Sequence, residues 1–142
     1  MHPRTLIRNA FLERLMDNTL AQENVYDSRT YPFDDNLLPA IIIFSKDEQI
    51  VTRNIGKPLT LTRELKVAVE CYVKSENMAH VVIDSMANSI EELILFDPTL
   101  SDLCKSCWLD STSIDLNSDA EKPIAVGTLN FLVTYQTNIY RR

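Results

Sequence analysis

Glycine is the residue that this sequence most clearly lacks. Only Gly56 and Gly127 occur in its 142 residues, whereas average usage of roughly 7% would give about ten. Loops that cradle phosphates or dinucleotides need several glycines, because their backbone approaches an anion closely or adopts positive φ. Two isolated glycines cannot form a P-loop or a dinucleotide fingerprint. The nucleotide-dependent enzymes built on such loops are therefore excluded.

Positive charge is also scarce. The chain has 14 Lys and Arg against 20 Asp and Glu, a net charge of −6, and a pI of about 4.8. Affinity for nucleic acid comes mainly from Lys and Arg that neutralise phosphates, so this balance argues against nucleic acid as the main partner. The contents of 45% hydrophobic and 24% charged residues are ordinary for a globular protein. They predict a single domain over residues 1–142, with a core that needs no disulfide or metal.

Long hydrophobic runs are absent too. Charged and polar residues interrupt the apolar ones near the N-terminus, so we expect no secretory signal. No window approaches the ~18 apolar residues of a membrane span. The three cysteines are too few for a disulfide framework, and their number is odd, which agrees with a reducing compartment. We therefore expect a protein that is made and kept in the cytoplasm and does not enter a membrane.

Hydrophobic spacing predicts two main helices. In residues 3–21 apolar side chains recur at steps of three and four, with a proline in the first turn. Residues 77–95 show the same period, and Asn77 can cap the N-terminus of that helix. A further short helical stretch is predicted over residues 99–105.

Most of the remaining chain has the pattern of strands. A short strand is predicted at residues 25–29, and residues 40–44 are apolar on both faces, which is typical of a central strand covered on each side. Residues 59–74 alternate clearly between apolar and polar, so we expect a long strand with one solvated face and one end projecting beyond the core. Residues 108–116 and 124–137 predict two further strands.

The connections complete the predicted architecture. Residues 48–54 are compatible with a modest strand, residues 56–58 with a turn, residues 31–39 with an ordered loop and residues 117–123 with an acidic loop. Strands and helices do not alternate regularly, which disfavours a doubly wound sheet. We therefore expect an α+β fold with a mixed, largely antiparallel sheet, two main helices packed on it, and the order α-β-β-β-α-β-β.

Four residues offer the candidate chemistry that leaves an alternative open. Cys104 and Cys107 form a C-x-x-C, but a redox dithiol requires its first thiolate at a helix N-terminus after a strand. A zinc site requires two further ligands, for which Cys71 and His80 are the available residues. Free cysteine is among the most buried residue types, so core packing is the favoured interpretation. A small cytosolic thiol or zinc protein remains the alternative, and otherwise we expect no enzyme, no catalytic residue and no cofactor.

Several short strings along the chain give a resemblance to a known family. They are Asp27-Ser28-Arg29, Phe33-Asp34, residues 38–44, Leu100-Ser101-Asp102-Leu103 and the closing residues 129–135. In this order they resemble the lambda-type phage minor tail protein U family, in which a Gly stands at the place of Ser28. The resemblance covers nearly the whole chain.

This resemblance implies a phage or prophage tail terminator. Such a protein is not an enzyme; it forms a ring of six copies on the end of the tail tube, stops tube polymerisation and provides the surface for head attachment. The implied partners are further copies of the chain, the tail tube protein, a head-tail joining protein, and DNA that passes through the lumen without specific binding. The implied location is the host cytoplasm during assembly and then the virion tail. Another head-tail joining or tube-like subunit is the alternative within this class.

The regions that fit a single core poorly are the expected contact surfaces. They are residues 48–58, the outer part of the strand at residues 59–74, and the acidic loop at residues 117–123. Projecting strands of this kind commonly serve in assembly. The residues predicted to contact other subunits or the tube are Gln49, Val51, Arg53, Ile55, Lys57, Arg63, Asp119 and Glu121.

Overall fold

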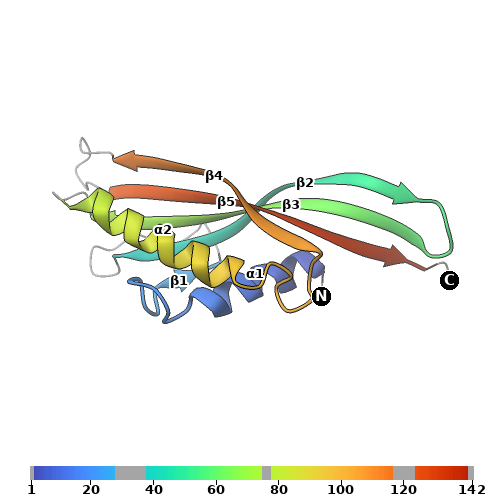
Figure 1. Ribbon diagram of the computed structural model, residues 1–142, viewed down its shortest axis with the longest axis horizontal. Coiled ribbons are helices and arrows are strands. Elements are labelled where there is room, and N and C mark those ends of the chain that lie inside the picture. Colours follow the sequence, from blue (N-terminus) through green and yellow to red (C-terminus); the bar gives the residue numbers. More distant parts are fainter. Residues whose placement is uncertain (1, 28–37, 75–77, 117–123, 141–142) are drawn as a thin grey trace.

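Two helices pack on a twisted five-stranded sheet in the computed structural model, which describes residues 2–27, 38–74, 78–116 and 124–140 (Figure 1). The strand order across the sheet is β1-β2-β3-β5-β4. β1 pairs in parallel with β2, and the other neighbours pair antiparallel. The predicted α+β class, the mixed sheet and the order α-β-β-β-α-β-β are confirmed.

The elements run in chain order through both layers. They are α1 Pro3–Leu15, β1 Val25–Tyr26, β2 Ala40–Asn54, β3 Leu59–Lys74, α2 Ala79–Leu95, β4 Ser106–Leu116 and β5 Ile124–Ile139. The two long strands β3 and β5 are paired without a break from Leu59 opposite Ile139 to Lys74 opposite Ile124. This pair of strands lies between β2 and β4 in the order of the sheet.

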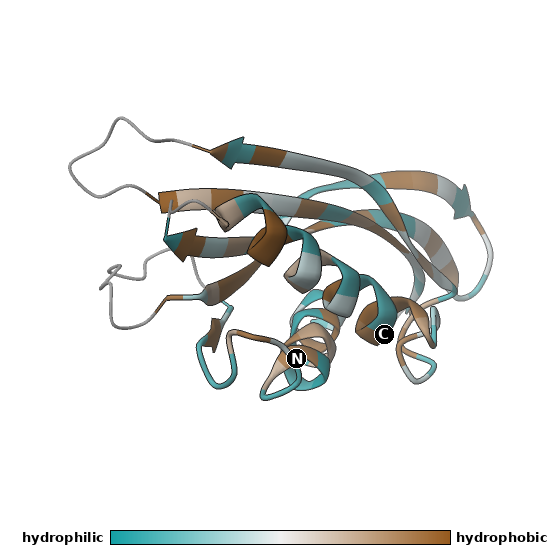
Figure 2. Cartoon of the chain, turned by 60° about the vertical axis from the view of Figure 1, so that its left-hand side comes forward, coloured by the Kyte–Doolittle hydropathy of each residue, from teal (hydrophilic) through white to brown (hydrophobic). Residues whose placement is uncertain are grey.

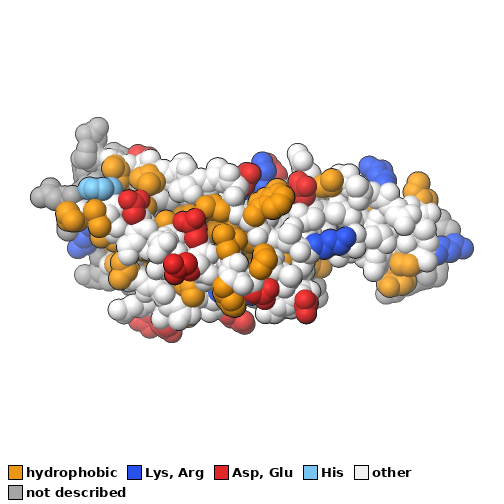
Figure 3. Space-filling model, viewed as in Figure 1, with side chains coloured by type: hydrophobic (Ala, Val, Ile, Leu, Met, Phe, Trp, Pro, Cys, Tyr) orange, Lys and Arg blue, Asp and Glu red, His pale blue; other side chains and the backbone are white. Residues whose placement is uncertain are grey.

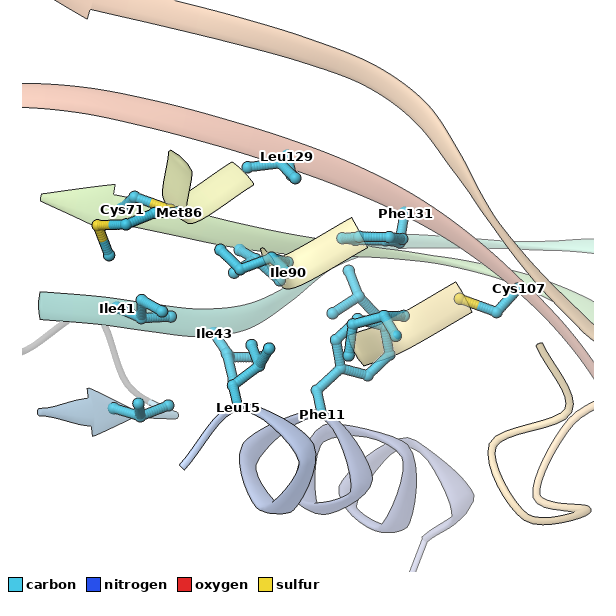
Figure 4. Packing of buried hydrophobic residues seen from close by; sticks show 14 of the residues in the cluster. Phe11, Leu15, Ile41, Ile43, Cys71, Met86, Ile90, Cys107, Leu129 and Phe131 are labelled. Atoms are coloured by element: carbon cyan, nitrogen blue, oxygen red, sulfur yellow. The ribbon is translucent and has the colours of Figure 1, made fainter. Parts of the chain in front are cut away.

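Both helices cover the same face of the sheet (Figure 2). α1 contributes Ile7, Phe11 and Leu15, which recur every four residues and are fully buried. Figure 4 shows Phe11 directed at Phe131 of β5; their ring centroids are 5.4 Å apart in an edge-to-face arrangement. Residues 129–135 of β5 alternate, and the odd-numbered ones are all buried in this core.

The first helix ends earlier than predicted. The structure ends α1 at Leu15, where the pattern had extended the helix to residue 21. Asp17 has a φ of 61°, and its N–H donates to the carbonyl of Gln22 at 2.8 Å. Asp tolerates this left-handed conformation better than most residues, so a local turn replaces the last helical turns.

The short helical stretch predicted at residues 99–105 is wrong. Leu100, Ser101 and Asp102 have φ values of 51°, 58° and 67°, so this segment is a series of turns. The Asp97 carboxylate accepts hydrogen bonds from the hydroxyl of Thr99 and from the N–H of Ser101, which compete with helical bonding. These bonds, that from the Thr99 hydroxyl above all, lower the pKa of Asp97 to about 2. Asn77, residues 28–37 and residues 117–123 lie outside the described part of the chain.

The two strands expected at residues 40–44 and 48–54 form one continuous strand, β2. Two β-bulges, between Ser45 and Glu48 and between Ile50 and Thr52, each add one residue to β2 relative to β3. The polar residues around the first bulge had suggested a break in the strand. The bulge instead places Glu48 opposite Leu65, on the face of the sheet that the helices cover.

A third bulge divides β4 into two parts with different alternation. It lies between Leu109 and Ser111. Regular alternation over residues 108–116 would put Trp108 in one row with Ile114, but Trp108 pairs with Leu132 on the face without helices, and Ile114 pairs with Gly127 on the covered face. A single added residue reverses the faces of a strand because side chains alternate with a period of two.

The sheet extends well beyond the helices. β2, β3 and the end of β5 continue past α1 as a narrow extension, which is the right-hand part of Figure 1. We call this extension the arm and define it as residues 49–63 together with residues 136–140; the rest is the body. The prediction that one end of the strand at residues 59–74 projects is confirmed.

One glycine is required by the packing of α2 on the sheet. A Cβ atom at Gly127 would lie 2.6 Å from Cγ2 of the buried Ile83, whereas a Cβ at Gly56 would meet nothing closer than 3.5 Å. We expect Gly127→Ala to lower the free energy of unfolding by roughly 1–2 kcal/mol, because α2 must move away from β5. The matched control Gly56→Ala should stay within about 0.5 kcal/mol of the parent protein. Urea denaturation measures both; equal midpoints for the two variants would contradict the close approach.

Candidate assembly surface

The arm exposes large apolar side chains. Ile55 is 90% exposed, Tyr140 is 70% exposed and Val51 is 50% exposed. At the tip there is a hollow of about 650 Å³. Its lining consists of Ile55, Gly56, Lys57, Pro58, Leu59, Ile139 and Tyr140. Apolar groups gathered in this way at the end of a projection are typical of a protein contact site.

The arm differs from the body in charge. Its residues include Arg53, Lys57 and Arg63 and no Asp or Glu, which is a charge of +3 in a chain with a net charge of −6, so the rest carries −9. On the face shown in Figure 3, acidic side chains lie over the body, while the arm displays Lys and Arg. Arg53 and Lys57 are exposed. The arm can therefore attract an acidic partner surface even though the whole chain is acidic.

A charged network holds the base of the arm to the body. The Glu48 carboxylate accepts from Arg4 Nη1 of α1 at 2.8 Å and from Arg63 Nη1 of β3 at 3.1 Å. The Tyr135 hydroxyl of β5 donates to its other oxygen. Arg63 Nε also donates to the Thr137 hydroxyl at 3.0 Å. Three strands and the first turn of α1 thus meet at one carboxylate.

The network shifts the pKa values of its members in opposite directions. Burial alone would raise the pKa of Glu48, but hydrogen bonds from Tyr135 and Arg63 and the charges of Arg4 and Arg63 lower it below its ordinary value. Burial, together with the hydrogen bond to Glu48, raises the pKa of Tyr135 to about 12. Glu48 is therefore ionised and Tyr135 is neutral at physiological pH.

The structure brings most of the predicted contact residues together. Gln49, Val51, Arg53, Ile55 and Lys57 all lie on the arm and are exposed. The role of these residues in contacts remains a prediction.

Three predicted contact residues have a different placement. The side chain of Arg63 is only 14% exposed and its guanidinium is paired with Glu48, so it lies at the base of the arm. Asp119 and Glu121 lie outside the described residues. The prediction missed Glu48 and Tyr135, although an arginine that interrupts the apolar row of a strand is a signal for a buried acidic partner.

The three cysteines lie in the core and at its edge, with Cys71 far from the neighbouring Cys104 and Cys107. Cys71 is fully buried, Cys107 is 3% exposed and Cys104 is 9% exposed. Cys71 pairs with Gly127 and Cys107 with Val133, so about 20 Å of strand separates them; Figure 4 shows both. His80 is exposed on α2. Among the described residues no group of His, Cys, Asp and Glu is arranged to hold a metal.

The thiols should therefore be chemically inert in the folded protein. Burial raises the pKa of Cys71 and of Cys107 to about 12 and that of Cys104 to about 11. Since the thiolate is the reactive form, we expect alkylation by iodoacetamide at pH 8 to be at least about a hundredfold slower than for a free cysteine. Mass spectrometry of the labelled protein measures this rate, and unfolding in urea should restore it. A cysteine that reacts at the free rate in the folded chain would support the thiol hypothesis instead.

Neither helix in the described part of the chain has the length and apolar character needed to cross a membrane.

The candidate assembly surface is thus a sheet that runs past its core and ends in a basic tip with exposed apolar side chains. The comparisons with known proteins identify the family: the model of phage minor tail protein U matches residues 2–135, and the chain belongs to that family. The predicted membership is thereby confirmed. Among the curated proteins, none matches the chain.

The fold is shared with a component of a solved particle. A chain in the virion of a native gene transfer agent particle superposes with a TM-score of 0.53 and 10% sequence identity. The match covers 92% of this chain and 95% of that chain. At this level of identity the similarity concerns the fold, which extends over almost the whole of both chains.

Proposed function

We propose that this protein is a tail terminator. Its copies form a ring, of six subunits by the resemblance of the sequence, on the end of the phage tail tube. The observation that carries this proposal is the arm: a chain of the minor tail protein U family projects an exposed, apolar and basic extension that its own core does not use. The protein has a structural role in the assembled tail and performs no catalysis.

Ring formation follows from the two unlike ends of the molecule. A contact between two different patches joins subunits head to tail, and it gives a closed ring when the rotation between neighbours closes. A closed ring that covers the last layer of tube subunits blocks further addition. Its outer face is then free to receive a head-tail joining protein.

The charge of the chain suits the passage of DNA. A ring on the tail tube has DNA moving through its lumen, and an acidic wall repels the phosphate backbone and prevents sticking. The body, with its charge of −9, is the part that supplies such a wall. In this account the chain folds as one domain, assembles in the host cytoplasm and remains in the virion tail.

Tube polymerisation in the presence of the protein tests the proposal. Purified tail tube subunits should grow into tubes of uncontrolled length without this protein and should stop growing when it is added. Electron microscopy measures the length distribution and shows whether a ring covers the tube end. Tubes that keep growing, with no density added at their ends, would contradict the proposal.

A further inference from the structure

We propose that the arm tip of one copy docks on α2 of the next copy in the ring. The occupant of the hollow at the tip is thus a second copy of this chain. The inference rests on the proposed ring and names the two surfaces that meet in it.

The tip supplies an apolar hollow with positive charges beside it. Ile55 and Tyr140 form its exposed rim, and Lys57 is part of its lining. Arg53 lies near the end of β2, where it pairs with Leu61, and it is exposed. The complementary surface must therefore combine apolar side chains with carboxylates.

α2 and the turns after it form the matching acidic surface. Residues 79–102 contain five acidic side chains and no Lys or Arg; Asp97 is paired with Arg14 of α1 at 3.2 Å, and the other four acids are Asp84, Glu91, Glu92 and Asp102. Asp84, Asn88 and Glu92 are spaced four apart, so they form one exposed stripe along the helix. In Figure 3 red side chains gather over this part of the body.

Exposed apolar residues lie at both ends of the acidic stripe. Val81 is 44% exposed near the N-terminus of α2, and Phe96 is 73% exposed directly after its C-terminus. The guanidinium carbon of Arg14 lies 4.6 Å from the centre of the Phe96 ring, on the body. Along α2 the exposed groups are therefore apolar, then acidic, then apolar. The acidic groups complement the basic groups of the tip, and the apolar groups complement its apolar rim.

The geometry requires that the partners belong to different copies. In Figure 1 the tip lies at one end of the long axis, and α2 lies over the body toward the other end. The tip of a chain therefore cannot reach its own α2. Since the two patches are different, each copy offers one of each to its neighbours, which is the head-to-tail contact that a ring requires.

Charge reversal with complementation tests this inference. The tip variant is Arg53→Glu with Lys57→Glu, and the helix variant is Asp84→Lys with Glu92→Lys. Each is added alone to growing tail tubes, and capped ends are counted by electron microscopy. We expect each variant alone to reduce the fraction of capped ends at least tenfold.

Mixing the two variants in equal amounts should restore capping. The acidic tip of the first then faces the basic helix of the second, and the basic tip of the second faces the acidic helix of the first, so a ring of alternating copies closes. The matched control combines Glu13→Lys on α1 with Lys66→Glu on the face of β3 without helices, both exposed. The control should cap as the parent protein does.

The outcomes separate this inference from the proposed function. If the parent protein caps tubes and both variants also cap them, the docking inference is wrong and the terminator function stands. If the variants fail and their mixture fails too, the tip binds a different partner such as the tube protein, and the inference is again wrong. If the parent protein caps no tubes, the terminator function itself fails.

Discussion

Removal of the arm tip should abolish ring formation and leave the body folded. The variant replaces residues 51–62 with Asn-Gly, so that a two-residue turn connects Ile50 to Arg63, a pair that already faces across the hairpin. Asn-Gly forms the tight turn that suits such a hairpin. The variant loses Val51, Ile55 and both exposed arm cations. Because these groups form the proposed contact, we expect at least a tenfold loss of capped tubes.

The body should tolerate this change because its core does not include the tip. Far-UV circular dichroism and thermal unfolding should show a cooperative transition like that of the parent protein. The matched control keeps the arm at full length and changes only Gly56 to Ala. A shortened protein that still caps tubes normally would show that the arm takes no part in assembly.

Loss of the Glu48 carboxylate should destabilise the protein strongly. We expect Glu48→Leu to lower the free energy of unfolding at pH 7 by about 3 kcal/mol, because Arg63 and Arg4 lose their shared anion while Arg63 stays largely buried. The Tyr135 hydroxyl also loses its acceptor. Asp47→Leu, at the exposed neighbouring position, is the control and should change stability by less than about 0.5 kcal/mol. Urea denaturation measures both variants.

The effect of Glu48 should disappear in acid. Its pKa is lowered in the folded state, so its stabilisation is complete above the unfolded-state pKa, about 4.3, and is lost as the pH falls through the folded-state value. The difference in stability between the parent protein and Glu48→Leu should therefore shrink from pH 7 to about pH 3. Asp97 has a pKa shifted in the same direction but is present in both proteins, so it does not contribute to the difference. A difference that is constant with pH would show that Glu48 acts through packing and not through its charge.

Periodicity was sufficient to predict the long elements. Alternation in β3 placed Leu65, Val67 and Val69 in the core, and the structure buries all three. The four-residue spacing of Ile7, Phe11 and Leu15 placed α1 against the sheet in the same way. Burial of a regular apolar row is the dominant stabilising term for such elements, so the pattern alone carries the information.

Single-residue irregularities were not predictable from the pattern. The bulge after Ser45 turns Glu48 to the covered face, and the partners that make this favourable lie 44, 15 and 87 residues away along the chain. The positive φ of Asp17 and of Leu100 is equally a result of local hydrogen bonding that competes with a weak helical pattern. The sequence could place five of the predicted contact residues on the arm because exposed apolar and basic groups at a strand end have no core to join; their role in contacts remains a prediction. Their anchor at Glu48 was not found, because an isolated glutamate carries no periodic signal.

The most direct test of the account is the image of the protein on the end of a tail tube. Electron microscopy of tubes grown to completion with the purified protein should show one closed ring at the terminal layer, with the arm of each copy reaching the next copy around the ring. Such a ring, absent from tubes grown without the protein, is the predicted result. Tubes of unlimited length that carry no terminal ring, or single copies scattered along their sides, would contradict the account.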